Sequence, residues 1–585
     1  GPSGGAPADA WMEVREVVRD LIADPPEWTV VRSTEGMEPS IGVLCPALRH
    51  GLDGADLPSI VIPPPGEIRF RLGEFEGPLF LRLRAGVDIS AVRALGKGHP
   101  EGVFGFEVRV DGRTVQEAEV PIHFSYSHAG SEWVDIGGPD GIEVRSDAEV
   151  VLRTFARSPG GEDVIPAKKI DVGFGGIRLE RHRRVPRTRS SADSPNLLLV
   201  VMDTQRMDRI SAYGYPRRTT PQVESLAEGG VVFENAYSTS SWTWPATASI
   251  LTGLQPEEHG VRDSSSCFLS YQITTIAEVL QAAGVTTAAW SGNPLITASR
   301  GFDQGFEFFQ ADRGRFQKAG EFFGDVTEWL REHRGMRFFV YLQLIEPHQP
   351  YVPLPAGGDL LAPGLGESER KEAVRVIARA ARAPLSGDFG ADVSNGVASE
   401  EERERISQLY DACVWSGDRW VGELLRVLDE LDLAGKTVVV FTSDHGEELF
   451  ERGRVGHGKR LYEELVHVPL VIAGPGIPRG LRVPSVVSNR SVAPFLASLA
   501  DASLGHPLDR DGLFDPEHSG RVALFSTQHG FWKENPRTLL IGMRKGSRVI
   551  LAAPEVEVPD AENDATALGN MELFDLSSDP EQRRN

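Results

Sequence analysis

The chain is poor in cysteine. Its 585 residues include only three, Cys45, Cys267 and Cys413, and none of them forms a CxxC pair. Such few and scattered cysteines argue against a disulfide framework and against a thiolate zinc site. They are compatible with both oxidising and reducing compartments.

Long apolar runs and an excess of positive charge are also absent. No stretch approaches the roughly 20 apolar residues that span a bilayer, and the start, GPSGGAPADA, lacks the basic and apolar regions of a secretory signal. A trimmed signal would leave the same start, so the cellular address stays open. Asp and Glu number 84 against 61 Lys and Arg. We therefore expect no membrane span and no nucleic-acid partner.

The length of the chain predicts more than one folding unit. In an N-terminal tail, residues 1–26, the stretch WMEVREVVRDLIAD has roughly helical spacing before a Pro-Pro pair and predicts a short amphipathic helix. Residues 27–185 contain short alternating runs such as EIRFRLGEF and FGFEVRVDG, which predict an antiparallel β sandwich or jelly roll. The basic, Ser-rich stretch RHRRVPRTRSSADSP predicts a linker, which we bound at residues 186–195.

Residues 196–505 alternate continuous apolar strands with helices. NLLLVVMD, VTTAAWSGN, RFFVYLQLIEPH and KTVVVFTSDHG predict buried strands, and TTIAEVLQAAG and DRWVGELLRVLDEL predict helices. This texture predicts an α/β domain with a mostly parallel sheet covered by helices on both faces. Residues 506–585 predict a small antiparallel sheet from runs such as TLLIGMRKGSRVILAA.

Five polar residues follow predicted strands directly: Asp203, Asn293, His348, Asp444 and His445. Function gathers at the carboxyl ends of the strands in such sheets. Two carboxylates and an imidazole that converge there would suit a divalent metal of intermediate softness, manganese or zinc before magnesium. Singly, each residue has a structural alternative, because an aspartate after a strand often caps a helix and a lone histidine usually satisfies a local hydrogen bond.

Thr243 stands in the stretch SSWTWPATASILTG, at the start of a helix that we expect to begin near Pro245. A helix N-terminus directs unsatisfied N–H groups at a bound anion. A metal on the threonine oxygen would lower its pKa and create a nucleophile. The structural alternative is a simple N-cap. We expect Trp242 and Trp244 to pack this turn, although Trp242 could line the pocket.

Several blocks of the sequence resemble the sulfatases, within the alkaline phosphatase superfamily. The opening block, residues 200–261, runs from VVMDTQRMDRISAYGY to STSSWTWPATASILTGLQPEEHGV, and IEPHQPYVP, FTSDHGEELFERGRVGHGKRLYEELVHVPLVIAGPG and ELFDLSSDPEQ follow in the family's order. The resemblance runs from about Asn196 to the end, roughly two-thirds of the chain. It implies an alkaline-phosphatase-like fold, an ester hydrolase, and a periplasmic or extracellular address.

Carried over by this resemblance, Asp203, Asp444 and His445 fall on metal ligands. Thr243 falls where sulfatases carry the cysteine or serine that is oxidised to formylglycine. Threonine has no route to formylglycine, and the arginine expected four residues later is replaced by Thr247. Thr243 would therefore act as itself and also ligate the metal, as in the lipoteichoic acid synthases, lipid A phosphoethanolamine transferases and nucleotide pyrophosphatases that the site resembles.

The resemblance also implies substrate-binding and catalytic groups. His348 matches the histidine of the PHxP block, and His457 stands where many relatives have a substrate-binding lysine, with Lys459 nearby. Asn293 lies in the substrate loop, and His529 is a further candidate. The block LIEPHQ lacks the aspartate that two-metal relatives require, which favours one divalent ion, manganese or zinc first and calcium or magnesium second. His348 and His457 would then supply hydrogen bonds and positive charge.

These residues predict a metal-dependent hydrolase of phosphate or phosphonate esters, with a diester favoured. Formylglycine hydrate expels sulfate by elimination, whereas a covalent Thr243 intermediate must be broken by attack at its central atom. The alternatives are a sulfate ester hydrolase without formylglycine, a phosphotransferase to another hydroxyl, and an inactive protein that binds an anion or glycan. We expect a small or polymeric anionic ester as substrate and no catalytic group from the β sandwich.

Overall fold

The computed structural model describes most of the chain. The described residues are 10–44, 57–88, 103–121, 133–138, 140–157, 162, 164–165, 171–262, 268–312, 315–381, 398–505, 513–514, 522–528, 539–552, 571–579 and 582. Cys45, Cys267 and His529 lie outside them. The chain forms two compact units, the first made of Gly1–Pro186, Phe268–Thr274 and Thr297–Gln304, and the second of Arg187–Cys267, Thr275–Ile296 and Gly305–Asn585.

Two antiparallel sheets build the first unit, as the alternating runs predict. A seven-stranded sheet has the order β10-β6-β12-β4-β3, with β1 and β9 pairing β12 and β6, and a five-stranded sheet has the order β2-β5-β11-β7-β8. Their inward side chains form one core, which includes Ile60, Phe106, Leu152 and Phe174. The strands are β1 (Trp11–Asp20), β2 (Trp28–Arg32), β3 (Ser40–Leu44), β4 (Leu57–Val61), β5 (Gly66–Arg71), β6 (Leu79–Val87), β7 (Val103–Val110), β8 (Arg113–Pro121), β9 (Val134–Ile136), β10 (Ile142–Val144), β11 (Glu149–Arg157) and β12 (Val172–Pro186).

The helix predicted for residues 11–24 is wrong, because Trp11–Asp20 form strand β1. Met12 and Val14 are buried while their neighbours are not, which is the two-residue period of a strand. β1 pairs antiparallel with β12 from Trp11↔Pro186 to Asp20↔Arg178. The apolar spacing of the segment fits both periods, and the long partner strand decides between them.

The first part of the basic stretch, residues 181–186, is also strand and not linker. Strand β12 continues to Pro186, and His182 and Arg184 pair Arg15 and Glu13 of β1. The alternating acidic and basic side chains of the two strands account for this pairing. Arg187 is the first residue of the second unit.

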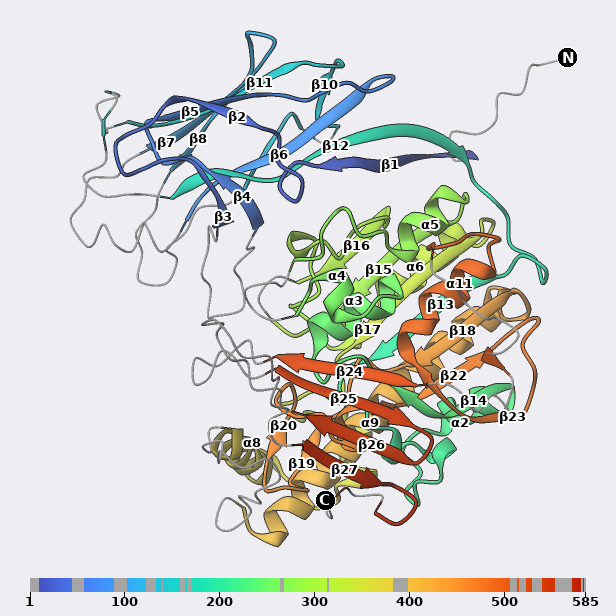
Figure 1. Ribbon diagram of the computed structural model, residues 1–585. Helices are drawn as coiled ribbons and strands as arrows, with labels where there is room; N and C mark the ends of the chain where they lie inside the picture. The colour runs from blue at the N-terminus through green and yellow to red at the C-terminus, as the bar shows by residue number, and fades with distance from the viewer. Residues whose placement is uncertain are drawn as a thin grey trace, which may run out of the picture. The chain divides into compact units, whose positions relative to one another are not determined.

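A nine-stranded sheet is the centre of the second unit (Figure 1). Its order is β16-β15-β17-β13-β18-β22-β14-β21, with β23 beside β14. The run from β16 to β18 is parallel, and β22 pairs β18 and β14 antiparallel. The strands are β13 (Asn196–Met202), β14 (Gly230–Tyr237), β15 (Thr286–Ser291), β16 (Phe308–Ala311), β17 (Phe338–Leu344), β18 (Thr437–Thr442), β21 (His467–Val468), β22 (Leu470–Ala473) and β23 (Leu481–Ser488).

Helices cover both faces of this sheet, so the predicted α/β fold is confirmed. Figure 1 shows α3, α5 and α11 side by side, and they contact one another on one face. Helices α2, α6 and α9 contribute side chains to the core on the other face. The helices are α2 (Pro221–Glu228), α3 (Thr243–Thr252), α4 (Pro256–His259), α5 (Ile276–Ala282), α6 (Phe323–His333), α7 (Pro355–Leu361), α8 (Glu367–Ala381), α9 (Glu400–Glu430), α10 (Glu463–Val466) and α11 (Val492–Ser498), with 3-10 turns η2 (Met207–Arg209), η3 (Ser211–Tyr213), η4 (Ala298–Arg300), η5 (Ala319–Glu321), η6 (Ala434–Lys436) and η7 (Asn489–Ser491).

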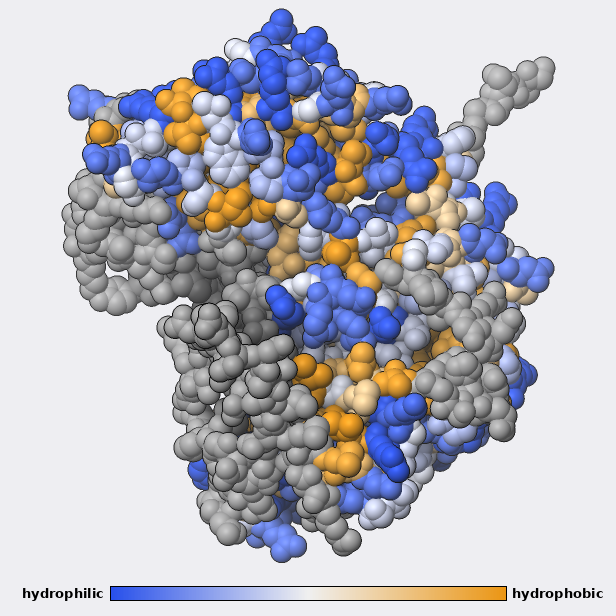
Figure 2. All heavy atoms as spheres, in the orientation of Figure 1, coloured by the Kyte–Doolittle hydropathy of each residue, from blue (hydrophilic) through white to orange (hydrophobic). Residues whose placement is uncertain are grey.

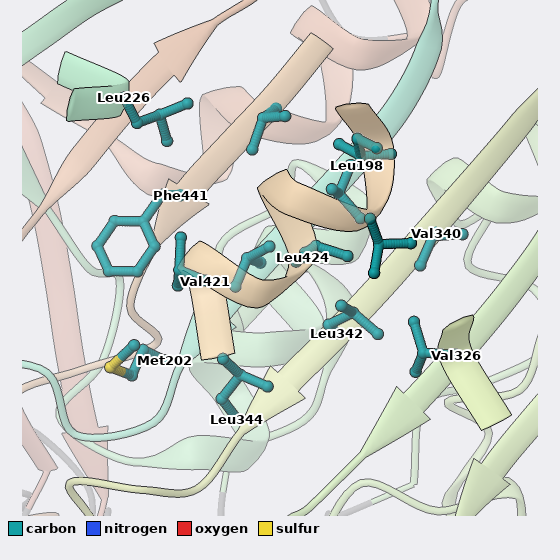
Figure 3. Close-up of a cluster of buried hydrophobic side chains, with 14 of the residues drawn as sticks. Leu198, Met202, Leu226, Val326, Val340, Leu342, Leu344, Val421, Leu424 and Phe441 are labelled. Atoms are coloured by element: carbon teal, nitrogen blue, oxygen red, sulfur yellow. The ribbon is translucent and has the colours of Figure 1, made fainter. Parts of the chain in front are cut away.

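The core under α9 fixes which way each strand residue points. In the hydrophobic core between the sheet and α9, Val340, Leu342 and Leu344 of β17 lie in one cluster with Leu424 of α9 (Figure 3). Successive side chains of a strand alternate between faces, so Gln343 points to the opposite face, where α3 lies. The same alternation places the odd-numbered residues of β13 on the α3 face.

A four-stranded antiparallel sheet follows near the C-terminus, as predicted. Its order is β24-β25-β26-β27, with β24 (Ala523–Gln528), β25 (Leu539–Lys545), β26 (Arg548–Ala552) and β27 (Met571–Asp575). A short antiparallel hairpin lies between β18 and α10 in the chain. Its two strands, β19 (Glu448–Leu449) and β20 (Val455–Gly456), have two residues each. Figure 2 shows hydrophobic side chains over the C-terminal sheet, where Leu524, Ile541 and Leu573 are exposed. Among the helices in the described part of the chain, none is both long and apolar enough to cross a membrane.

Candidate active site

Three buried side chains meet at the carboxyl ends of two neighbouring strands. Asp203 follows β13, and Asp444 and His445 follow β18, which pairs β13 in parallel. One ligand atom of each residue lies within 4.8 Å of the other two. We call Asp203, Asp444 and His445 the strand-end group. All three are fully buried, so the convergence expected from the sequence is present.

Neutral donors hold both carboxylates of this group. Asp203 Oδ2 accepts hydrogen bonds from Asn293 Nδ2 (2.7 Å) and Gln343 Nε2 (3.0 Å). Asp444 Oδ2 accepts one from the same Gln343 Nε2 (3.1 Å), and its Oδ1 accepts the backbone N–H groups of His445 (2.9 Å) and Thr204 (3.3 Å). Asp203 Oδ1 is buried and has no hydrogen-bond partner among the described residues.

The electrostatics of the strand-end group call for a cation. Burial and the neighbouring charge of Asp444 raise the pKa of Asp203, and burial raises the pKa of Asp444 to about 6. Burial lowers the pKa of His445 to about 4, which keeps the imidazole neutral and able to ligate. A buried carboxylate oxygen without a donor is costly. Two carboxylates, one unpartnered oxygen and a neutral imidazole therefore fit a divalent metal ion.

Thr243 lies against this group as the first residue of α3. Its Oγ1 is 3.3 Å from His445 Nε2 and 3.4 Å from Asn293 Nδ2, and the side chain is 1% exposed. Trp242, not Thr243, occupies the N-cap position, so the structural alternative of a simple N-cap is wrong. His445 Nδ1 faces the Gly446 carbonyl at 2.9 Å, which leaves Nε2 as the ring nitrogen that faces Thr243 and can ligate a cation.

Two further histidines extend the site. The rings of His445 and His457 lie 4.4 Å apart, and those of His457 and His348 lie 5.1 Å apart. Burial opposes charge on His457, but Glu447 Oε1, 2.9 Å from its Nδ1, outweighs burial and raises the pKa of His457. His348 Nδ1 faces the Gln349 carbonyl, and burial lowers its pKa to about 3. One histidine is therefore suited to carry a proton and the other to remain neutral.

The loop that carries His457 is joined to the turn before the threonine. Gly458 donates its N–H to the Ser241 carbonyl at 2.8 Å. A Cβ at Gly458 would lie 3.3 Å from Trp242 Cβ, so the two segments pack closely. Lys459 follows in this loop and is partly buried. The rings of Trp242 and Trp244 are buried edge to face, as expected for residues that pack the turn.

Two residues of the site escaped the sequence analysis. Gln343 is the one strongly polar side chain in the otherwise apolar and aromatic strand β17, and that isolation is the signal that marks it. Glu447 follows Asp444 and His445 after one glycine and is fully buried. Asn293, predicted to bind substrate, contacts both Asp203 and Thr243.

A family model described as Sulfatase matches residues 195–502, which is more than half of the 585 residues. The chain belongs to the sulfatase family. The matched region contains the whole strand-end group, Thr243 and both neighbouring histidines. The protein is therefore an ester hydrolase of the alkaline phosphatase superfamily.

Curated relatives of this sulfatase agree with the family. The arylsulfatase K of Bos taurus is 28% identical over 435 residues, which cover 67% of this chain and 78% of the relative. The choline-sulfatase of Rhizobium meliloti (strain 1021) is 27% identical over 359 residues, which cover 53% of this chain and 68% of the relative. Both alignments are long but have low sequence identity, so they support the class of enzyme, an ester hydrolase.

Solved structures share the fold of this sulfatase at low identity. The phosphonate monoester hydrolase of Agrobacterium radiobacter has a TM-score of 0.53 and 19% identity, covering 67% of this chain and 91% of that chain. A protein in complex with its substrate, D-glucosamine-2-N,6-O-disulfate, has a TM-score of 0.51 and 19% identity, covering 67% and 93%. These likenesses bear on the α/β fold alone.

Proposed function

We propose that this protein hydrolyses singly charged esters of a tetrahedral oxyacid, with a sulfate ester as the first candidate, through a covalent intermediate on Thr243. The observation that carries the proposal is the position of Thr243 Oγ1, 3.3 Å from His445 Nε2 at the edge of the strand-end group. A hydroxyl at a helix N-terminus beside a metal-binding group is suited to nucleophilic catalysis.

One divalent ion completes the proposed site. Asp203, Asp444, His445 and Thr243 would hold it, with manganese or zinc favoured and calcium or magnesium possible. When bound, the ion would lower the pKa of the Thr243 hydroxyl and withdraw charge from the ester. The block LIEPHQ lacks the aspartate that two-metal relatives require, so we propose a single metal, with His457 and the neutral His348 beside it.

The charges of the site favour a substrate with one negative charge. Asp203 and Asp444 balance a divalent ion, and Glu447 balances a protonated His457. The N–H groups at the start of α3 then supply attraction for the ester, and Lys459 is proposed as a further contact. Sulfate esters, phosphonate monoesters and phosphodiesters carry one charge at neutral pH, whereas phosphate monoesters carry nearly two.

The residues have separate tasks in the proposed reaction. Thr243 Oγ1, after its proton has passed to solvent, attacks the central atom, and the bond from that atom to the leaving oxygen breaks. His457, charged through Glu447, gives its proton to the leaving oxygen as general acid. Water then attacks the same central atom and gives a proton to His457, which is neutral after the first step, and the bond from that atom to Thr243 Oγ1 breaks. Asn293 orients the threonine through its 3.4 Å hydrogen bond.

The choice between sulfate and phosphorus esters rests on two different observations. The curated relatives include arylsulfatases and a choline-sulfatase, which supports a sulfate ester. The plain hydroxyl of Thr243 favours a phosphodiester or phosphonate monoester as the second candidate, because displacement at phosphorus releases such an intermediate readily. Small and polymeric anionic esters, sulfated sugars among them, both fit the proposal. No nucleic-acid partner is proposed for this acidic chain.

The test compares kcat/KM for matched p-nitrophenyl sulfate, phosphodiester, phosphonate monoester and phosphate monoester on the manganese-loaded protein. We expect the sulfate to be turned over fastest and every singly charged ester to exceed the phosphate monoester. A lead by the phosphodiester or phosphonate would select the second candidate. A preference for the phosphate monoester would contradict the charge argument, and a metal-loaded protein inert toward all four would contradict the proposed activity.

A further inference from the structure

Gln343 touches both carboxylates of the strand-end group at once. Its Nε2 lies 3.0 Å from Asp203 Oδ2 and 3.1 Å from Asp444 Oδ2, so the two N–H bonds of one amide reach two aspartates. The side chain is fully buried. Among the described residues, Gln343 is the one side chain that donates a hydrogen bond to both carboxylates.

The orientation of this amide follows from its other contact. The Tyr341 hydroxyl donates to Gln343 Oε1, and tyrosine at neutral pH is a donor. With Oε1 so occupied, Nε2 must face the aspartates, since a flipped amide would set an oxygen against two carboxylates. Tyr341 is itself buried and two residues earlier in β17, so both side chains point to the same face.

The Gln343 amide determines which oxygens of the two aspartates remain available to bind a cation. Gln343 and Asn293 both donate to Asp203 Oδ2, and Oδ1 of the same carboxylate is left without a partner. A neutral donor lowers the repulsion between two buried carboxylates without balancing their charge. An arginine or lysine at this position would balance it and remove the need for a cation.

We propose that Gln343 is a positioning residue, which fixes the two aspartates so that Asp203 Oδ1 and the neighbouring Asp444 carboxylate face a divalent ion. This inference rests on the metal site of the proposed function. Residues that orient ligands in this way typically change metal affinity by about 10- to 100-fold when they are replaced. Tyr341 supports the same arrangement from behind Gln343.

The experiment measures the Kd for Mn²⁺ of the full-length chain, by calorimetry and by the electron paramagnetic resonance of free Mn²⁺. Gln343→Met keeps an unbranched side chain of similar length and removes both donors, and we expect its Kd to rise about 10- to 100-fold. Tyr341→Phe removes only the hydroxyl that orients the amide, so a rise of a few-fold is expected. Gln304→Met is the matched control, because Gln304 Nε2 donates to the Leu269 and Gly301 carbonyls in the first unit.

The outcomes separate this inference from the proposed function. A wild-type protein that binds no Mn²⁺ would overturn the metal site itself. A wild-type protein that binds it, together with Gln343→Met and Tyr341→Phe variants of unchanged Kd, would overturn the role of Gln343 alone. If Gln343→Met does not fold, Tyr341→Phe decides. A Gln304→Met variant that weakens Mn²⁺ binding equally would assign the effect to general loss of packing and also overturn the inference.

Discussion

Two buried polar clusters of the second unit differ in how their charges are balanced. In the strand-end group, Asp203 and Asp444 receive hydrogen bonds from neutral amide groups, and one carboxylate oxygen has no partner among the described residues. Asp411 is equally buried, but its carboxylate accepts from two arginines, Arg209 and Arg217, and from Tyr215.

The difference teaches how to distinguish a binding site from a structural network. Asp411 on α9 has opposite charges on both of its oxygens, so its cluster is complete without any ligand. Among the described residues, the two carboxylates of the strand-end group have no cationic hydrogen-bond donor, and His457 acts on Asp444 only at longer range. The carboxylates of Asp203, Asp444 and Asp411 are equally buried, and the balance of charge separates the two clusters.

The largest effect is expected from Thr243→Ala, which removes the nucleophile and leaves the strand-end group in place. We expect kcat/KM for the best p-nitrophenyl ester to fall on the order of 10⁴-fold, because an essential nucleophile has no substitute. The metal content, measured by mass spectrometry, should fall much less than activity. Turnover at the wild-type rate would exclude Thr243 as the nucleophile.

Asp411→Asn should break the balanced cluster. The substitution leaves Arg209 and Arg217 without their shared carboxylate, so we expect the free energy of unfolding to fall by about 3 kcal/mol in urea denaturation. The stoichiometry of bound Mn²⁺ should stay unchanged. A neutral effect on stability would show that the two clusters are not energetically different.

Asp444→Asn should raise the free energy of unfolding of the metal-free protein, whereas Asp411→Asn lowers it. The folded state raises the pKa of Asp444 from 3.8 to about 6, so the folded state binds this proton more tightly than the unfolded chain does. Stability of the metal-free wild type should therefore decrease as pH rises from about 4 to about 6, and Asp444→Asn should remove that loss.

At pH 7.5 we expect the EDTA-treated Asn variant to be more stable than the EDTA-treated wild type by about 3 kcal/mol. The same variant should bind Mn²⁺ poorly. The check is urea denaturation across pH, with Asp411→Asn as the control. Equal destabilisation by the two asparagine substitutions would contradict the comparison of the clusters.

The smallest effect is expected from Glu447→Gln. This carboxylate raises the pKa of His457, so its loss lowers that pKa and moves the basic limb of the pH profile of kcat/KM to lower pH. At pH 8 we expect a loss of about 10-fold for an alkyl ester and less for a p-nitrophenyl ester, whose leaving group needs no proton. An unshifted profile would separate His457 from proton transfer.

Most of the sheet could be predicted from the sequence, because continuous apolar runs such as residues 196–202 have only one environment open to them. The segment at residues 11–20 could not, since its apolar positions fit a helix and a strand equally well. Only its pairing with β12, more than 150 residues later, resolves the choice. Long-range pairing is not visible in local spacing.

The same limit applies to the site. Asp203, Asp444 and His445 could be predicted because each follows a strand, and parallel strands end at one edge. Gln343 could not, because its importance comes from reaching across to β13 and β18, the strands that carry the two aspartates. The contact of Asn293 with both Asp203 and Thr243 likewise depends on how separate loops meet.

The backbone just after Asp203 also makes the site observable. Thr204 has φ 56, a left-handed conformation that threonine rarely adopts, and it is held there by the Asp444 carboxylate at its N–H and by the Tyr410 hydroxyl at its carbonyl. Any ion that draws charge from Asp444 must weaken the first of these hydrogen bonds. The chemical shift of the Thr204 amide should therefore report whether an ion occupies the metal site. It can be followed by nuclear magnetic resonance with a diamagnetic ion such as zinc and without any substrate.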